Sequence, residues 1–247
     1  MRLYYDLHLH SCLSPCGDDD MTPMNMAGMG MLKGLSVMAL TDHNTVKNCP
    51  AFFEACEGYG IVPIAGMELS TAEDVHMVCL FPTLASAQRF EAVFDSHRMP
   101  IDNDPEVFGN QIVMGSNDCE IGRMTPLLIA ASDLWMGDAV ALVREMGGVI
   151  YPAHIDRTSS GIVAILGDIP PEYAFTAMEY RDGDKREAYE ALYPEAKGKT
   201  VVVSSDAHTL GRINEAENFF DLPLKEGATH DEIRAAILHY LDPTWRI

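Results

Sequence analysis

Histidines and carboxylates at the ends of strand-like segments could bind divalent metals in this chain. In "DLHLH", Asp6, His8 and His10 alternate with apolar residues, so a β-strand would carry all three on one face. Comparable residues end four other apolar runs: Asp42 and His43 in "LTDHN", Glu68 in "AGMELS", His154 in "YPAHI", and Asp206 and His208 in "VSSDAH". One histidine at a strand end is more often a polar cap than a ligand, but five such ends are hard to reach by chance. Imidazole and carboxylate together suit Zn, Mn or Fe, and a cluster of two or three metals would need this many ligands.

The segments that carry these residues are short and apolar, and helical patterns separate them. We predict strands at 2–10, 36–42, 61–69, 75–81, 148–155, 175–181 and 200–206, and helices at 23–33, 46–58, 84–97, 126–146, 184–196 and 229–241. Several of the strand runs are continuously apolar, which is typical of parallel strands covered on both faces. Seven βα units predict a barrel-like α/β fold and one domain over 1–247.

In such a barrel the carboxyl ends of all strands lie at one mouth, where active sites are assembled. The side chains named above would therefore meet there. His76 lies near the start of its run rather than the end, so it fits this arrangement less well. Asp6 and Asp42 are candidates for the carboxylates that orient metal-binding histidines from behind.

The segment 98–125 interrupts the βα pattern. It is polar, contains glycines and shows no periodicity, and it is too long for an ordinary connection. We expect an insertion there, as a lid or a small subdomain.

The composition bears on partners and location. The 247 residues carry a net charge of −20, so we expect no nucleic-acid polymer as a partner, because phosphate contacts need clustered Lys and Arg. No run of 18 apolar residues and no signal-peptide core are present, so we expect no membrane association. The six cysteines form no CxxC pair, which favours reduced thiols and a cytoplasmic location.

Taken together and in order, these motifs resemble the PHP (polymerase and histidinol phosphatase) family. The matching segments are "DLHLHS" at 6–11, "TDHN" at 41–44, "GMELS" at 66–70, "VHMV" at 75–78, "PAHI" at 152–155 and "SSDAH" at 204–208. The resemblance implies a distorted seven-stranded (βα) TIM-like barrel and a centre of three divalent transition metals, Zn, Mn or Fe. The implied ligands are His8, His10, Glu68 and Asp206 for one metal, Glu68, His76 and His154 for a second, and His43, His208 and Asp18 for the third.

Asp18 rests on an alignment of one loop. Many relatives have "SDG…TP" after the first motif, whereas this chain reads "SPCGDDDMTP". Aligning the "TP" at 22–23 matches Asp18 and leaves "PCG" inserted, so Cys16 or Asp19 could take its place.

Family members without polymerase modules are mostly phosphoesterases of small molecules. The resemblance thus implies an enzyme, a metal-dependent phosphatase that hydrolyses a small phosphorylated metabolite or nucleotide through a metal-bridging hydroxide. Glu68 and Asp206 would act in catalysis through the metals. Arg157, in "AHIDR", is the first candidate for a catalytic phosphate clamp, Arg181 is the second substrate-binding candidate and Arg212 the third.

Two other functions fit parts of the pattern. A metallohydrolase of an amide or cyclic C–N bond could use a similar mouth, but such enzymes commonly need a strand-end lysine or a lone Asp base, and no lysine ends a predicted strand. A metal-binding regulatory module without turnover, or a polymerase accessory domain, is the second alternative. The sequence predicts no oligomeric state.

Overall fold

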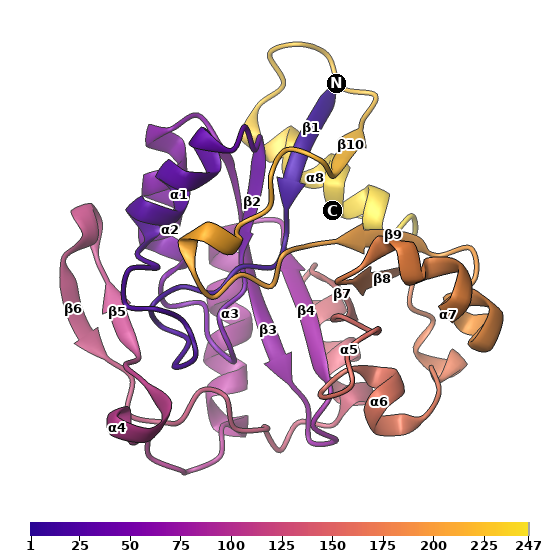
Figure 1. Cartoon of the computed structure of the whole chain (residues 1–247), viewed down its shortest axis with the longest axis horizontal. Coiled ribbons are helices and arrows are strands. Elements are labelled where there is room, and N and C mark those ends of the chain that lie inside the picture. The colour runs from indigo at the N-terminus through magenta and orange to yellow at the C-terminus, as the bar shows by residue number, and fades with distance from the viewer. Residues whose placement is uncertain (247) are drawn as a thin grey trace.

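The computed structural model, which describes residues 1–246, is an α/β fold around one curled sheet (Figure 1). This central sheet has the strand order β10-β1-β2-β3-β4-β7. Its strands are β1 (Arg2–Asp6), β2 (Val37–Leu40), β3 (Val62–Ser70), β4 (His76–Phe81), β7 (Val149–Pro152) and β10 (Phe219–Asp221). Two small sheets accompany it, β5 (Ile112–Met114) with β6 (Glu120–Arg123), and β8 (Ala177–Tyr180) with β9 (Thr200–Val203).

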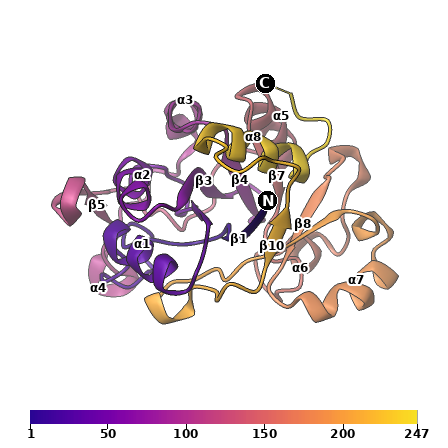
Figure 2. The same ribbon diagram turned by 90° about the horizontal axis from the view of Figure 1, so that it is seen from above.

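The helices are α1 (Pro23–Leu32), α2 (Cys49–Gly58), α3 (Leu84–Phe94), α4 (Pro105–Phe108), α5 (Met136–Glu145), α6 (Ile162–Leu166), α7 (Arg186–Leu192) and α8 (His230–Leu241). Several of them, α1, α3, α4 and α8, begin at a residue whose side chain caps them. Thr22 caps α1, and Thr229 forms a capping box at α8, so both side chains bind backbone N–H groups that a helix start leaves free. Figure 2 shows α1 and α2 on the left of the molecule and α6 and α7 on the right.

Alternation along the strands separates two apolar cores, which explains the continuous apolar runs. Val37, Ala39 and Ile64 face a cluster that includes Ile237 and Leu241 of α8. Their neighbours on the same strands face a second cluster with α1, α2, α3 and α5, which includes Met38, Leu40, Phe52, Phe90 and Val143. Both faces of the central strands are therefore buried.

Strand directions differ from the predicted parallel barrel at one place. Each of the seven predicted strand ranges contains a strand, and β1, β2 and β3 are parallel. However, β4 is antiparallel to both β3 and β7, because residues 71–75 form a tight turn, with Thr71 N donating to Val75 O. A parallel crossover needs about a dozen residues or more, so this connection cannot make one. The α/β class is confirmed, while the seven strands do not form a single closed sheet.

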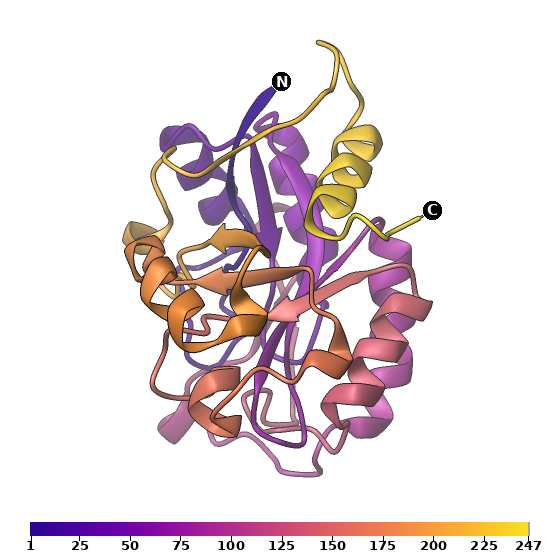
Figure 3. The same ribbon diagram turned by 90° about the vertical axis from the view of Figure 1, so that its right-hand side faces the viewer.

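The small sheet β8–β9 completes the curl. Figure 3 shows it crossing the central strands. Ile155 N donates to the carbonyl of Glu179 at 2.9 Å on one side, and Leu9 pairs with Ala207 in a parallel bridge on the other. The site therefore lies between the end of the central sheet and this small sheet.

Residues 98–125 are ordered, with α4 and the β5–β6 hairpin. Ile112 N donates to Cys12 O at 2.9 Å, and Met114 N donates to Asn48 Oδ1 at 2.8 Å. The hairpin thus packs beside α2 and the loop after β1 (Figure 1). The predicted helix at 126–146 begins only at Met136. Within residues 1–246, no helix combines the length and apolar character needed to cross a membrane.

Candidate metal centre

Five histidines surround one carboxylate near the carboxyl end of β3. Glu68 is 1% exposed, and His43 and Glu68 form a parallel bridge that joins the loop after β2 to β3. Its Oε1 lies 2.9 Å from His76 Nδ1, 3.0 Å from His154 Nε2 and 3.3 Å from His8 Nε2, and its Oε2 lies 3.1 Å from both His10 Nε2 and His43 Nδ1. Reversal of β4 brings His76 here, because it stands opposite Ser70 in the β3–β4 register. His76, which lies near the start of its strand and fitted the predicted arrangement less well, therefore lies beside the other histidines.

A second carboxylate, Asp206, follows β9. Its Oδ1 lies 3.2 Å from His10 Nε2, 3.6 Å from His8 Nε2 and 3.7 Å from His208 Nδ1. Asp206 has a φ of 51° and His154 a φ of 29°, values that non-glycine residues rarely adopt. Such strained backbone clusters at functional sites, where the surrounding structure holds it.

Hydrogen bonds fix how His8 and His10 face the site. His8 Nδ1 lies 2.8 Å from Glu179 Oε1, and His10 Nδ1 lies 2.9 Å from Ser14 Oγ. The single hydroxyl proton of Ser14 goes to Asp42 Oδ1 at 2.7 Å, so Ser14 must accept from His10. When neutral, both rings therefore carry the proton on Nδ1 and turn bare Nε2 atoms toward each other, 3.1 Å apart. A divalent cation bound beside them would accept both lone pairs.

The electrostatics of the site are those of buried carboxylates surrounded by imidazoles. Burial lowers the pKa of His10, but Asp206 and Glu68 outweigh it and raise the pKa to about 9. Burial and the neighbouring imidazole of His10 lower the pKa of His208 to about 4. Burial also raises the pKa of Glu68, yet His76 and His8 hold it well below its usual range. Both carboxylates are thus ionised and available to cations.

Three sets of donor atoms have the spacing of metal ligands. Their atoms lie within 4.8 Å of one another, and the sets are His8, His10, Glu68 and Asp206; His43, Glu68 and His76; and His10, His43 and His208. His154 adjoins the first two through Glu68 Oε1. Within residues 1–246, buried His154 Nδ1 and Asp206 Oδ1 make no hydrogen bond. Unsatisfied buried donors and acceptors in a mixed imidazole and carboxylate set fit divalent transition metals.

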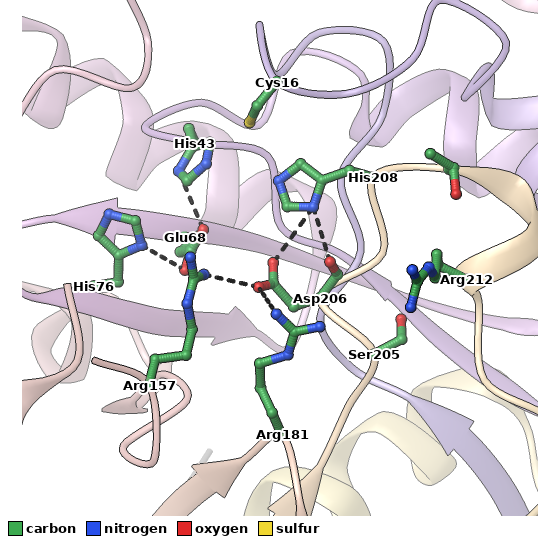
Figure 4. Close-up of a pocket in the computed structure, with 11 residues that line it drawn as sticks. Cys16, His43, Glu68, His76, Arg157, Arg181, Ser205, Asp206, His208 and Arg212 are labelled. Atoms are coloured by element: carbon green, nitrogen blue, oxygen red, sulfur yellow. Dashed lines mark hydrogen bonds and ion pairs between the residues drawn. The ribbon is translucent and has the colours of Figure 1, made fainter. Parts of the chain in front are cut away.

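The structure does not bring Asp18 into these sets. Its side chain is exposed, and its backbone N–H donates to His208 O at 2.9 Å. The neighbouring Asp19 accepts from Asn110 at 2.9 Å, while Cys16 lines the cavity beside His43 and His208 (Figure 4). The inserted residues "PCG" therefore turn the aspartates outward and leave a thiol at the mouth. Asp18 as a metal ligand stays a prediction.

A cavity of about 450 Å³ opens beside the cluster. Arg157, Arg181 and Arg212 line it together with Asp206 and His208 (Figure 4). Arg157 Nη1 lies 3.0 Å from Asp206 Oδ2, and Arg181 Nη1 lies 3.8 Å from the same oxygen. All three arginines named from the sequence thus reach one space.

Buried aspartates hold the loops that carry these side chains. Asp156 accepts the backbone N–H of Arg181 at 2.8 Å and of Asp182 at 3.1 Å. Asp6 accepts those of Ser205 and Asn214, each at 3.0 Å, and so fixes both ends of the loop after β9. Within residues 1–246, Asp6 makes no hydrogen bond to a histidine ring, contrary to its expected role, because its two oxygens accept from the backbone of this loop. Asp42 fills that role only through Ser14.

Sequence reasoning missed Glu179, which is fully buried and contacts His8 directly. An acidic residue inside the apolar run "FTAMEYR" was the available signal. Its partner lies 171 residues earlier in the chain, so no local spacing links them.

Comparison with known proteins gives the family. The model of the PHP domain matches residues 6–147, more than half of the chain. The fold and the clustered histidines and carboxylates are those of a metal-dependent hydrolase. The chain belongs to the PHP domain family.

Similar proteins differ in what they act on. A 5'-3' exoribonuclease of Haemophilus influenzae is 34% identical over 83 residues, 32% of this chain and 29% of that protein. The structure of endonuclease Q from Pyrococcus furiosus has a TM-score of 0.63 at 20% identity and covers 96% of this chain and 56% of its own. A protein named as a metal-dependent phosphoesterase from Bifidobacterium adolescentis has a TM-score of 0.60 at 18% identity and covers 94% and 95%. This chain therefore spans about half of endonuclease Q and less than a third of the exoribonuclease.

The expectation that nucleic-acid polymers are not partners is wrong. Endonuclease Q, which shares this fold, has been solved with a 27-mer duplex that carries an abasic lesion at its active site. The expectation used the net charge of the whole chain, −20, whereas a substrate responds to the charges that line the cavity it enters. Here three arginines line the cavity of an otherwise acidic protein.

Proposed function

We propose that this hydrolase is a phosphoesterase whose substrate is a small phosphorylated metabolite or a nucleotide, including a nucleotide at the end of a nucleic-acid strand. The observation that carries the proposal is the shared cavity, in which Arg157, Arg181 and Arg212 face the carboxylate and histidine cluster. Anionic oxygens of a phosphoester suit guanidinium groups, which can bind two of them at once.

The proposed ligands of the metals follow the family pattern. They are His8, His10, Glu68 and Asp206 for one ion, Glu68, His76 and His154 for a second, and His43 and His208 for a third, with Asp18 or Cys16 completing it. Zn, Mn or Fe bound there would lower the pKa of water and neutralise phosphate oxygens. Glu68 would serve two ions in this proposal, which is supported by the different histidines that its two oxygens face.

Arg157 and Arg181 have a defined task in this proposal. Both guanidinium groups face Asp206 Oδ2, and the two side chains are partly exposed, at 34% and 44%. A side chain held at one end and open at the other can bind an incoming phosphate without a large loss of conformational freedom. Of the two arginines, we assign Arg157 the closer contact with the phosphate, because its guanidinium lies nearer to Asp206 of the cluster.

Hydrolysis of an amide or cyclic C–N bond has less support. No lysine is among the described residues that line the cavity, and three arginines are an anion-binding feature that such a substrate does not require. The regulatory alternative, metal binding without turnover, is decided by the same experiment.

The test is a phosphate-release screen of protein reconstituted with Mn, Zn or Fe. The panel contains phosphorylated metabolites, mononucleotides, short oligonucleotides with 5' or 3' phosphates, and an amide and a cyclic imide as controls. Glu68→Gln is the inactive variant, expected to lose at least about 10³-fold of the activity. Glu91→Gln is the matched control, because Glu91 is also buried but pairs with Arg98. Release from no phosphoester, or equal release by Glu68→Gln, contradicts the proposal.

A further inference from the structure

One oxygen of Glu179 joins two segments of the cluster. Glu179 lies on β8 and is fully buried. Its Oε1 is 2.8 Å from Nδ1 of His8, on the segment after β1, and accepts the backbone N–H of His154, on the segment after β7, at 3.0 Å. Both histidines turn Nε2 toward Oε1 of Glu68, at 3.3 Å and 3.0 Å.

The two contacts of Glu179 Oε1 restrict the protonated form of the His8 ring and the backbone conformation of His154. Without an acceptor at Nδ1, His8 could place its proton on Nε2, which would remove the lone pair that a metal needs. His154 has a φ of 29°, and such a backbone persists only where its surroundings hold it. Glu179 supplies that hold twice, through its side chain to His154 N–H and through its carbonyl, which accepts from Ile155 N at 2.9 Å.

The burial of Glu179 argues against a purely structural role. A buried carboxylate is costly unless it is compensated, and Oε2 has no hydrogen-bond partner within residues 1–246. A glutamine would keep the carbonyl oxygen that accepts both bonds and would avoid the buried charge. The chain instead places an anion behind a histidine, which makes that imidazole a stronger donor to a cation.

We propose that Glu179 is a positioning residue of the metal centre, which fixes the Nδ1–H form of His8 and the strained backbone of His154 through one shared oxygen. This inference rests on the proposed metal-dependent function. It requires that metals bind, but it does not depend on which substrate is hydrolysed.

The experiment compares Glu179→Gln and Glu179→Leu with Glu91→Gln and Glu91→Leu. Gln keeps an acceptor at Oε1, whereas Leu removes it, and the pair at Glu91 measures the general effect of changing a buried glutamate. Zn²⁺ affinity is measured by chelator competition, and thermal stability is recorded for each variant. The Nδ1–H signals of histidine are followed by NMR in the Zn²⁺-loaded proteins labelled with ¹⁵N.

We expect Glu179→Leu to weaken Zn²⁺ binding about 10- to 100-fold and to lose one protected Nδ1–H signal. Glu179→Gln should retain that signal and recover only part of the affinity, because Gln keeps the acceptor oxygen but not the charge. Both Glu91 variants should lose stability without a change in Zn²⁺ affinity. If Glu179→Leu does not fold, Glu179→Ala takes its place.

Wild-type affinity and an unchanged Nδ1–H signal in Glu179→Leu or Glu179→Ala would overturn the assignment. So would equal loss of affinity in the Glu91→Leu control. A wild-type protein that binds Zn²⁺ but hydrolyses no phosphoester would contradict the proposed function and leave this inference standing. A wild-type protein that binds no Zn²⁺ would overturn both.

Discussion

At the scale of single residues, the site is built from two carboxylates shared among six imidazoles, with arginines on the open side. Glu68 and Asp206 each contact several histidines, so neither belongs to one ligand set alone. The guanidinium of Arg157 pairs with Asp206, and it is the backbone N–H of Arg157 that donates to His154 O, at 2.9 Å. Removing an arginine should therefore affect substrate without removing metal.

Arg157→Ala should lower kcat/KM for the identified phosphoester about 30- to 1000-fold, because a charge-assisted contact worth about 2–4 kcal/mol in the transition state is lost. Arg157→Lys should recover only part of this, since a lysine cannot make the planar two-point contact. Metal content is measured alongside, with Arg186→Ala as the control, because Arg186 pairs with Glu190 outside the cavity. Full activity of Arg157→Ala would refute the role, and joint loss of metal would assign Arg157 to the structure of the cluster.

At the scale of elements, loops after neighbouring strands are tied to each other by buried side chains. Asp156, after β7, binds the backbone that follows β8, and Asp6, at the end of β1, binds the loop after β9. These ties place arginines and ligands from distant segments in one cavity. They also predict that a residue outside the cavity lining controls substrate binding.

Asp156→Ala should lower kcat/KM about 10- to 30-fold, because it removes two hydrogen bonds of about 1 kcal/mol each that hold the backbone at Arg181. Since it acts through Arg181, the same change in an Arg181→Ala background should have little further effect. Asp184→Ala, an exposed change in the same loop, is the control. Additive losses in the double variant would show that Asp156 acts by another route.

The sequence predicts elements better than their directions and contacts. The predicted strand ends bring His8, Glu68, His154 and Asp206 close together, as expected for side chains at one mouth, while their role as metal ligands stays a prediction. The reversed direction of β4 was missed, although the short connection at 71–75 carried the information. Glu179 could not be found, because its contacts join residues far apart in the chain. The roles of 98–125 as a lid or subdomain and of 1–247 as a single domain remain predictions.

At the scale of the whole molecule, an acidic protein contains a buried, histidine-rich site. The net charge is −20, yet the buried cluster holds imidazoles whose pKa values are pulled apart by their neighbours. His208, with a pKa lowered to about 4 by burial and by His10, is neutral at pH 7. His10, with a pKa raised to about 9, is protonated there.

Zn²⁺ affinity should therefore rise with pH between about 7 and 9. Binding needs a neutral imidazole at His10, so the metal must displace a proton below the metal-free pKa of about 9. The apparent affinity should grow at least about tenfold per pH unit, because burial lowers the pKa of His8 but Glu179 and Glu68 outweigh it and raise that pKa well above its usual range, so His8 must lose a proton too. Chelator-buffered titrations of the metal-free protein measure this. An affinity that is constant from pH 7 to pH 9 would contradict it.

The most direct test of the account is the metal content of each chain. Protein reconstituted separately with Mn, Fe or Zn, freed of excess ion and measured by elemental analysis, should hold about two to three ions per chain, as the ligand sets imply. Glu68→Gln should hold fewer, because its carboxylate is shared between two of these sets. Less than one ion per chain with every metal would contradict the central claim that this cluster is a metal centre.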